Sequence, residues 1–241
     1  MNDELKEKVV WITGGNRGIG LAISDKFIEA GSQVIVSAST QDSFKEILSK
    51  YAKMDNVLFF PCDVSDPKQV HEVATKIKLA KGKVDILINN AGIAKFKPLI
   101  DITVDMFDSM NDINYKGTFL CIKELLPDML ERGNGIIANI LSGAAIKAFE
   151  NSSVYSATKA AVMAMTNCLR KEVRKKGISV VNVLPGATET DIWNPKIREE
   201  KRDKMMQPED VAAATFSAIK DSLNGRTMVE EVLVRPQGGD L

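Results

Sequence analysis

The chain has 241 residues, of which 44% are hydrophobic and 27% are charged, and its 32 basic side chains balance its 32 acidic ones. This composition is typical of a globular protein with a sizeable core, and the length allows one large α/β domain or two small ones. The charge balance argues against nucleic acid or an anionic membrane as a partner. The first eight residues are too charged for a secretion signal, and no apolar run reaches membrane length.

The cysteines and the single histidine form no metal-binding or disulfide pattern. Cys62, Cys121 and Cys168 are scattered and odd in number, which is typical of reduced thiols in a cytoplasmic protein. His71 falls in a predicted helix, and the chain has no second histidine. We therefore expect a cytoplasmic protein without a metal and without a histidine-based catalytic triad.

The first predicted unit is a strand at residues 9–13, a glycine-rich turn and a helix at residues 21–30. The turn reads Gly14-Gly-Asn-Arg-Gly-Ile-Gly20. Glycines let the backbone approach a phosphate, and the N-terminus of a helix favours an anion. This order of elements predicts a nucleotide-binding turn rather than a plain tight turn.

The next predicted strand, at residues 33–37, bears on the choice of cofactor. An acidic residue at its end would select NAD, because it accepts hydrogen bonds from the adenine ribose. The sequence has Ser37 and Ser39 there, and its first acidic residue is Asp42. Arg17 in the glycine-rich turn could pair with a phosphate on that ribose. These features favour NADP(H) over NAD(H), and the alternative is that Arg17 is a solvated loop charge.

Strands and helices continue to alternate along the chain. After a helix at residues 41–53, strands are predicted at 57–61, 84–88, 136–141, 178–184 and 228–234, with helices at 66–81, 104–112, 114–131, 153–176 and from 207 onward. No linker or repeat divides the sequence. We therefore predict one α/β domain, residues 1–241, with a Rossmann-type doubly wound parallel sheet of about seven strands and helices on both faces.

Residues 191–206 interrupt the alternation. They are rich in Lys, Arg and Glu and contain Pro195. We predict that they form a mobile flap, and the alternative is an ordinary solvated face.

Tyr155 and Lys159 are four residues apart and therefore lie on one face of the predicted helix. A free phenol has a pKa of about 10, and a nearby ammonium favours the phenolate. Ser142 follows a predicted buried strand, at the sheet edge where open α/β sheets bind ligands. A hydroxyl that holds a carbonyl oxygen and a phenol that protonates it would suit a carbonyl reductase.

Taken together, these motifs resemble the short-chain dehydrogenase/reductase family. The resemblance extends from about residue 8 to the C-terminus and rests on Thr13-Gly14-x-x-x-Gly18-x-Gly20, Asp63, Asn89-Asn-Ala-Gly92, Asn114, Ser142, Tyr155-x-x-x-Lys159 and Pro185-Gly186. It implies that Tyr155 is the general acid/base and that Ser142 orients the carbonyl. Lys159 would lower the pKa of Tyr155 and bind the nicotinamide ribose. Asn114 would hold a water between Lys159 and solvent.

The resemblance also implies a set of cofactor contacts besides Tyr155 and Lys159. The matching positions are Gly14, Asn16, Arg17, Gly18, Ile19 and Gly20 at the phosphates and adenosine, Ser37, Ser39, Asp63 and Val64 on the adenine side, Asn90, Ala91 and Gly92 at the nicotinamide-side ribose, and Pro185, Gly186, Thr188 and Thr190 at the nicotinamide. Two of them depart from the family pattern: the position of Thr188 is usually aliphatic, and Ser39 stands where an arginine usually binds the extra phosphate. The prediction of NADP(H) therefore depends on Arg17 and the serines.

The substrate is less constrained by the sequence. The core is similar to 3-oxoacyl-[acyl-carrier-protein] reductases, whereas the tail is similar to the sepiapterin-reductase-like branch, where a C-terminal acid, here Asp240, can meet the pterin. The predicted pocket wall includes Ala144, Phe149 and Trp193 besides Ser142, and suits an uncharged carbonyl compound with an apolar or flat ring-bearing body. We predict an NADP(H)-dependent reductase of a 3-oxoacyl thioester or small ketone. The alternatives are a pterin diketone reductase and a catalytically silent NADP-binding regulatory module.

The family resemblance also implies a homotetramer or a homodimer. Its expected interfaces are the predicted helices at 114–131 and 153–176 and the last strand.

Overall fold

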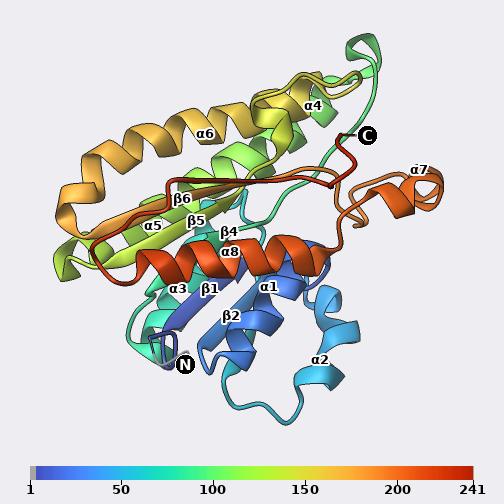
Figure 1. Cartoon of the computed structure of the whole chain (residues 1–241). Coiled ribbons are helices and arrows are strands. Elements are labelled where there is room, and N and C mark those ends of the chain that lie inside the picture. The colour runs from blue at the N-terminus through green and yellow to red at the C-terminus, as the bar shows by residue number, and fades with distance from the viewer. Residues whose placement is uncertain (1–3, 241) are drawn as a thin grey trace.

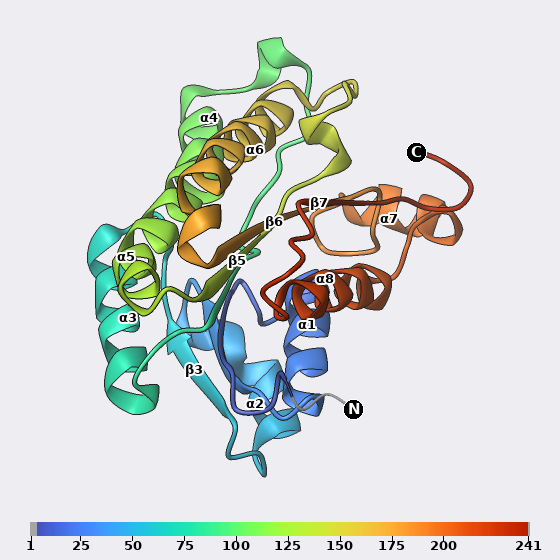
Figure 2. The ribbon, with the colours of Figure 1, turned by 60° about the vertical axis from the view of Figure 1, so that its left-hand side comes forward.

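The computed structural model describes residues 4–240, so residues 1–3 and 241 of the predicted domain lie outside the described part. Within it, seven parallel strands form one sheet in the order β3-β2-β1-β4-β5-β6-β7 (Figures 1 and 2). The strands are β1 (Val9–Thr13), β2 (Gln33–Ala38), β3 (Val57–Pro61), β4 (Ile86–Asn89), β5 (Gly135–Ile140), β6 (Ile178–Pro185) and β7 (Glu231–Val234). This arrangement confirms the predicted Rossmann-type doubly wound sheet.

Helices cover both faces of the sheet (Figure 2). One face carries α1 (Gly18–Glu29) and α8 (Pro208–Ser222), and the other carries α3 (Pro67–Lys81), α5 (Gly117–Arg132) and α6 (Ser153–Val173). The shorter helices are α2 (Lys45–Tyr51), α4 (Val104–Met110) and α7 (Pro195–Lys201).

The two faces have separate cores because side chains alternate along each strand. Val10 and Ile12 of β1 pack with Phe27 of α1 and Val211 of α8. Trp11 points the other way and packs in the core formed with α3, α5 and α6. Burial on both faces explains why the strands read as continuous apolar runs. It also leaves the carboxyl ends of the strands as the edge where polar side chains can gather.

The structure corrects three predicted boundaries. The break predicted at residue 113 is absent, because α4 continues through a π-helical turn, Asn111–Lys116, into α5. The last strand begins at Glu231 rather than at residue 228. The predicted flap is shorter, because Met205 and Met206 are buried and the Met206 N–H donates to the Ala187 carbonyl at 2.9 Å. We therefore use "flap" for residues 191–204, which contain α7, a helix with no buried residue.

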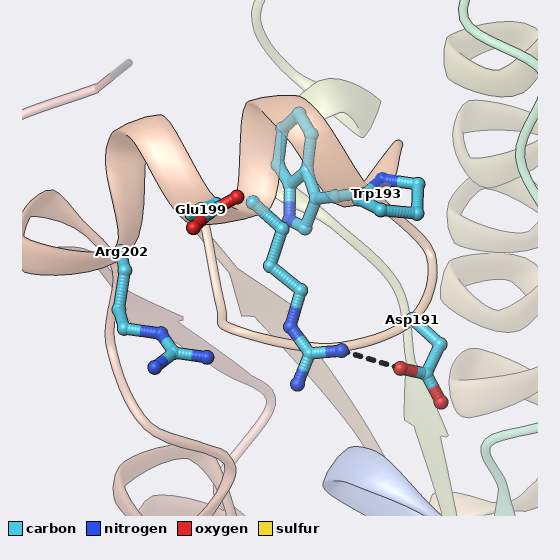
Figure 3. Close-up of a pocket in the computed structure, with 6 residues that line it drawn as sticks. Asp191, Trp193, Glu199 and Arg202 are labelled. Atoms are coloured by element: carbon cyan, nitrogen blue, oxygen red, sulfur yellow. Dashed lines mark hydrogen bonds and ion pairs between the residues drawn. The ribbon is translucent and has the colours of Figure 1, made fainter.

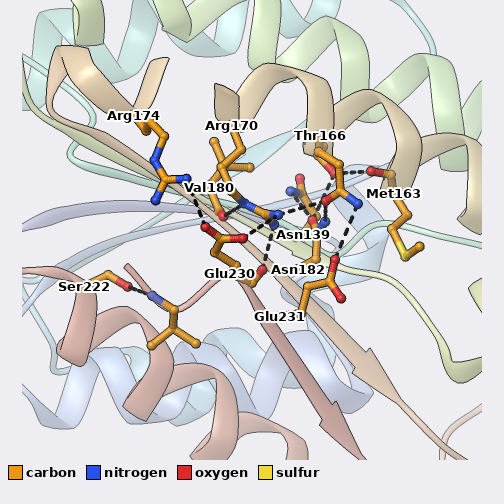
Figure 4. Close-up of polar contacts among 12 residues, drawn as sticks. Asn139, Met163, Thr166, Arg170, Arg174, Val180, Asn182, Ser222, Glu230 and Glu231 are labelled. Carbon is orange, nitrogen blue, oxygen red and sulfur yellow. Dashed lines mark hydrogen bonds and ion pairs between the residues drawn. The ribbon is translucent and has the colours of Figure 1, made fainter. Parts of the chain in front are cut away.

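A row of buried asparagines joins the central strands. Asn89 of β4, Asn139 of β5 and Asn182 of β6 stand in register. Asn89 Nδ2 donates to Asn139 Oδ1 at 2.9 Å, and Asn139 Nδ2 donates to Asn182 Oδ1 at 3.0 Å. The row continues from Asn182 Nδ2 to Asn167 Oδ1 at 3.1 Å, which also accepts from Arg170 (Figure 4). Because paired buried amides are costly to separate, this row holds in register the strands that present the predicted site.

Candidate active site

Two hydroxyl groups meet at the carboxyl end of β5. Ser142 follows this strand, and its Oγ accepts a hydrogen bond from the Ala144 N–H at 3.1 Å, which fixes the side chain. Tyr155, in the first turn of α6, is only 7% exposed and is hydrogen-bonded to Ser142. Burial raises the pKa of Tyr155, and the hydrogen bond with Ser142 opposes this in part. The structure thus brings together the predicted carbonyl-binding hydroxyl and the predicted acid.

Lys159 lies one helical turn after Tyr155, with its Nζ 5.9 Å from the centre of the tyrosine ring. The ammonium donates to the carbonyl of Ile140 at 2.9 Å. Burial lowers the pKa of Lys159 to about 8. The pKa of Tyr155 is raised overall because burial outweighs the hydrogen bond with Ser142. That Lys159 lowers this pKa stays a prediction.

Asn114 lies in the π-helical turn, a type of distortion that is frequent at functional sites. Its Oδ1 accepts from the Ile93 N–H at 2.8 Å, and its Nδ2 donates to the Ile93 carbonyl at 2.9 Å and to Thr158 at 3.0 Å. A Cβ added to Gly92 would lie 3.4 Å from both Asn114 Oδ1 and Lys159 Nζ. The Asn114 amide therefore holds residues 92 and 93 beside Lys159, and its polar atoms already have protein partners.

The glycine-rich turn between β1 and α1 depends on its glycines. Gly14 and Gly18 have φ angles of 62° and 52°, in the left-handed region that favours glycine. A Cβ on Gly20 would lie 2.3 Å from the Gly14 carbonyl oxygen. Asn90 Nδ2 donates to the carbonyls of Thr13 and Gly14 at 3.0 and 2.9 Å. Asn90 thus ties the turn to the end of β4, a supporting role that two amides at a strand end also allow.

The N-terminus of α1 fits a phosphate. Arg17 is the N-cap residue, and its side chain makes no capping hydrogen bond. The first N–H groups of a helix lack partners within the helix, so they can bind an anion. Asn16 Nδ2 donates to the Ser43 carbonyl at 3.0 Å and fixes the turn against the loop after β2, while Ile19 packs onto the core. The turn therefore fits the diphosphate of a dinucleotide.

The predicted adenine-side residues differ in accessibility. Ser37 is fully buried, and its Oγ accepts from Trp11 Nε1 at 3.0 Å, so the prediction of Ser37 as a side-chain contact is wrong. Ser39, two residues later, is exposed. The Asp63 carboxylate accepts from the N–H and the hydroxyl of Ser65 at 2.9 and 2.7 Å. Val64 is buried. Ser39 and Asp63 therefore remain the accessible polar groups of this set.

The predicted nicotinamide segment follows β6 and lies against the glycine-rich turn. The methyl group of Thr190 would be 3.1 Å from a Cβ on Gly18. Thr188 is buried, and its hydroxyl donates to the Gly186 carbonyl at 3.1 Å. The structure thus brings the segment beside the glycine-rich turn, with the Thr188 hydroxyl hydrogen-bonded within the segment. Pro185 is the last residue of β6. The Ala91 N–H donates to Thr13 Oγ1, at the end of β1, at 3.1 Å.

An aromatic residue that no sequence motif marks covers Tyr155. The ring of Phe96 meets the ring of Tyr155 edge to face, with centroids 5.6 Å apart and planes at 73°. Phe96 also stacks on Trp193, with centroids 5.1 Å apart and planes at 21°. The predicted wall residues Ala144 and Phe149 belong to the same apolar cluster. The predicted pocket wall therefore gains an aromatic ring that packs against the Tyr155 phenol.

The flap carries a network of ion pairs. Arg17 lies 3.8 Å from Asp191, with both side chains more than half exposed. Asp191 also accepts from Arg198 at 2.5 Å (Figure 3). Glu189 pairs with Arg198 and with Arg202. A hollow of about 500 Å³ lies within the flap, and its lining consists of Asp191, Trp193, Pro195, Arg198, Glu199 and Arg202 (Figure 3).

The C-terminal tail reaches the rim of the aromatic wall. The Asp240 carboxylate lies 2.6 Å from Lys147 and 3.6 Å from Arg235. The hydrogen bond with Lys147 is the main cause that holds the pKa of Asp240 below its usual range. Lys147 Nζ in turn lies 5.7 Å from the centre of the Phe149 ring. The Asp240 carboxylate therefore lies near the predicted pocket wall, where it is paired with the basic side chain of Lys147.

Metal-binding clusters and membrane spans are both absent from the described part of the chain. Among residues 4–240, no group of three or more His, Cys, Asp or Glu side chains is placed to hold a metal ion. No helix in the same range combines the length and the apolar character needed to cross a bilayer.

Comparisons with known proteins agree with this geometry. The family model described as short chain dehydrogenase matches residues 8–201. The chain is 35% identical over 235 residues to an uncharacterized oxidoreductase of Staphylococcus aureus (strain MRSA252), covering 96% of this chain and 98% of that protein. It is 34% identical over 241 residues to sepiapterin reductase of Chlorobaculum tepidum, covering 97% and 98%. The solved structure of ElxO with NADP bound is similar with a TM-score of 0.87 and 28% identity, covering 95% and 98%.

Proposed function

Because the chain belongs to the short-chain dehydrogenase/reductase family of oxidoreductases, we propose that it is an NADP(H)-dependent enzyme that reduces a carbonyl compound to a secondary alcohol. The observation that carries the proposal is the convergence of Ser142, Tyr155 and Lys159 beside the glycine-rich turn. A bound nicotinamide would supply the hydride. The similarity to ElxO, which was solved with NADP bound, supports the choice of cofactor.

The protein's own groups would provide the proton and hold the substrate. The Ser142 hydroxyl donates a hydrogen bond to the carbonyl oxygen and fixes it beside Tyr155. The phenol gives its proton to that oxygen, a type of step that typically contributes about 10²–10⁴-fold to the rate. Its raised pKa keeps the phenol protonated at neutral pH, which favours the reductive direction. The Lys159 ammonium, with a pKa of about 8, stabilises the phenolate that remains.

A screen of NADPH oxidation tests the proposal. Acetoacetyl thioesters, sepiapterin-like diketones, quinones and simple aldehydes cover the carbonyl classes that the apolar wall suits. We expect turnover with at least one class. NADPH binding without turnover of any carbonyl would instead favour the silent NADP-binding module.

The tail supports one second candidate, a pterin diketone reductase. It is favoured by the relative named sepiapterin reductase and by the position of Asp240 at the rim of the wall. The same screen separates this candidate from a reductase of 3-oxoacyl thioesters or small ketones, because a strong preference for the pterin diketone over the acetoacetyl thioester supports only the pterin diketone reductase.

Arg17→Ala is expected to weaken NADPH binding about tenfold and to leave NADH binding unchanged. A charge-assisted contact to a phosphate is worth about 1.5–3 kcal/mol, and the exposure of Arg17 places the expected effect at the lower end of that range. Titration of each cofactor by fluorescence measures both dissociation constants.

Asp191→Asn is the matched control for Arg17→Ala. It removes the carboxylate that pairs with Arg17 but keeps the guanidinium, so NADPH binding should stay as tight or become tighter. Equal dissociation constants of the native protein for NADPH and NADH would contradict the choice of NADP(H).

We also expect a homotetramer or a homodimer, because α4, the π-helical turn and α5 expose apolar side chains. Phe107, Tyr115 and Phe119 are 48%, 38% and 43% exposed at spacings of eight and four residues, so they form a stripe along the continuous helix. Phe119→Glu should lower the mass measured by light scattering towards that of the 26.4 kDa chain. Leu79→Glu, at an 83% exposed position on α3, should leave the mass unchanged. A native protein that is already monomeric would refute this expectation.

A further inference from the structure

The aromatic stack over Tyr155 has one fixed member and one loosely held member. Phe96 is fixed, because its ring packs against buried Tyr155 and the next residue, Lys97, donates its N–H to the Asn151 carbonyl at 2.8 Å. Trp193 belongs to the flap, and its indole is held by stacking on Phe96 and by one side-chain hydrogen bond, from Nε1 to the Thr188 carbonyl at 2.9 Å. Its backbone N–H donates to the Thr190 carbonyl at 3.4 Å.

The surroundings of Trp193 allow the indole to move. The helix that follows it in the flap, α7, has no buried residue. The ion pair between Arg17 and Asp191, which precedes Trp193, is between two exposed side chains and contributes little to stability. The hollow of about 500 Å³ is lined by Trp193 and by other flap residues but not by Phe96. It therefore offers space next to the indole among the flap residues.

Phe96 and Ala144 pack around the buried phenol ring of Tyr155. A substrate bound to the Tyr155 hydroxyl can therefore carry a ring beside Phe96. In the structure the Phe96 ring is stacked on the Trp193 indole. A planar ring in the substrate can make the same contact with the face of Phe96, whereas a flexible alkyl chain cannot.

We propose that Phe96 is a stacking platform that selects planar, ring-bearing carbonyl substrates. The indole of Trp193 occupies this platform in the free protein, and the ring of the substrate displaces it towards the hollow of the flap. Phe96 is thus a specificity-determining residue. This inference deepens the proposed function and rests on it, since it names the substrate class of the same site.

A pair of ketones of similar reactivity tests the selection. A methyl phenyl diketone presents a planar ring, and a methyl propyl diketone presents an alkyl chain. Phe96→Leu should lower kcat/KM for the phenyl compound about tenfold and change that for the propyl compound less than twofold, because ring pairs add about two- to tenfold in affinity beyond burial. Phe96→Tyr keeps the ring and should restore the preference.

Tryptophan fluorescence gives a readout that does not depend on turnover. The other tryptophan, Trp11, is fully buried in the sheet, so Trp193 dominates any ligand-induced change. With NADP⁺ bound no hydride is available, and titration with the phenyl diketone should shift the emission to longer wavelength as the indole leaves Phe96. Trp193→Phe should abolish the shift, and the propyl diketone should cause none.

The outcomes separate this inference from the proposed function. Equal losses for both ketones in Phe96→Leu, or binding of the phenyl compound without an emission shift, would overturn the platform while leaving the carbonyl reductase in place. Failure of the native protein to reduce any carbonyl compound would overturn the proposed function instead. In that case the fluorescence titration still decides whether a planar ring displaces Trp193.

Discussion

Tyr155→Phe is expected to lower kcat for carbonyl reduction by about 10²–10⁴-fold and to leave the NADPH dissociation constant nearly unchanged. The substitution deletes only the phenolic hydroxyl, so the carbonyl oxygen loses its proton donor. The ring remains, and with it the edge contact with Phe96 and the packing in the apolar cluster. Steady-state NADPH oxidation gives kcat, and a fluorescence titration gives the dissociation constant.

Tyr115→Phe is the matched control, because it deletes the same hydroxyl from a more exposed tyrosine in the π-helical turn. It should keep native turnover. If Tyr155→Phe also turned over at the native rate on a substrate that the native protein reduces, Tyr155 would not be the acid. A fall in kcat with a parallel loss of NADPH binding would show a damaged fold rather than a missing proton donor.

The fold was predictable from the sequence because its signals are local. β-branched apolar runs alternate with helical patterns, and each strand is closed by glycine, proline or a polar residue. The π-helical turn was not predictable, because Asn111–Lys116 adds a residue to one turn without a proline or glycine inside it to mark the change. The burial of Met205 and Met206 was not predictable for a different reason. Two apolar residues after a charged run are too few to show the spacing of a helix or a strand.

The candidate site was predictable where chain spacing fixes geometry. Tyr155 and Lys159 share a helix face, and Ser142 follows a strand that ends at the same edge of the sheet. The contact of Phe96 with Tyr155 was not predictable. Phe96 lies in a segment without regular structure, where no helical or strand spacing indicates which way a side chain points. The error at Ser37 was avoidable. Strand alternation puts Ser37 on the same face as Ile35, in the buried core that contains Trp11.

Gly20→Ala is expected to raise the NADPH dissociation constant by more than about 100-fold. A Cβ at this position would lie 2.3 Å from the Gly14 carbonyl oxygen and 2.4 Å from Asn90 Nδ2. Neither atom is the free end of a flexible side chain, because Asn90 Nδ2 is itself bonded to the carbonyls of Thr13 and Gly14. The turn must therefore open, and the helix N-terminus that would bind the phosphates moves with it. Forced overpacking of this kind typically costs about 1–3 kcal/mol of stability, so Tm should fall by about 5 °C for a chain of this size.

Gly238→Ala separates this effect from a general cost of replacing glycine. A Cβ on Gly238 meets nothing within 4 Å, and its φ lies outside the left-handed region, so NADPH binding and Tm should both remain native. The two measurements on Gly20→Ala carry separate information. A lower Tm with native NADPH affinity would mean that the turn opens and the cofactor still binds. The diphosphate would then not lie at the N-terminus of α1, because a diphosphate bound there must contact the backbone that the added methyl group displaces.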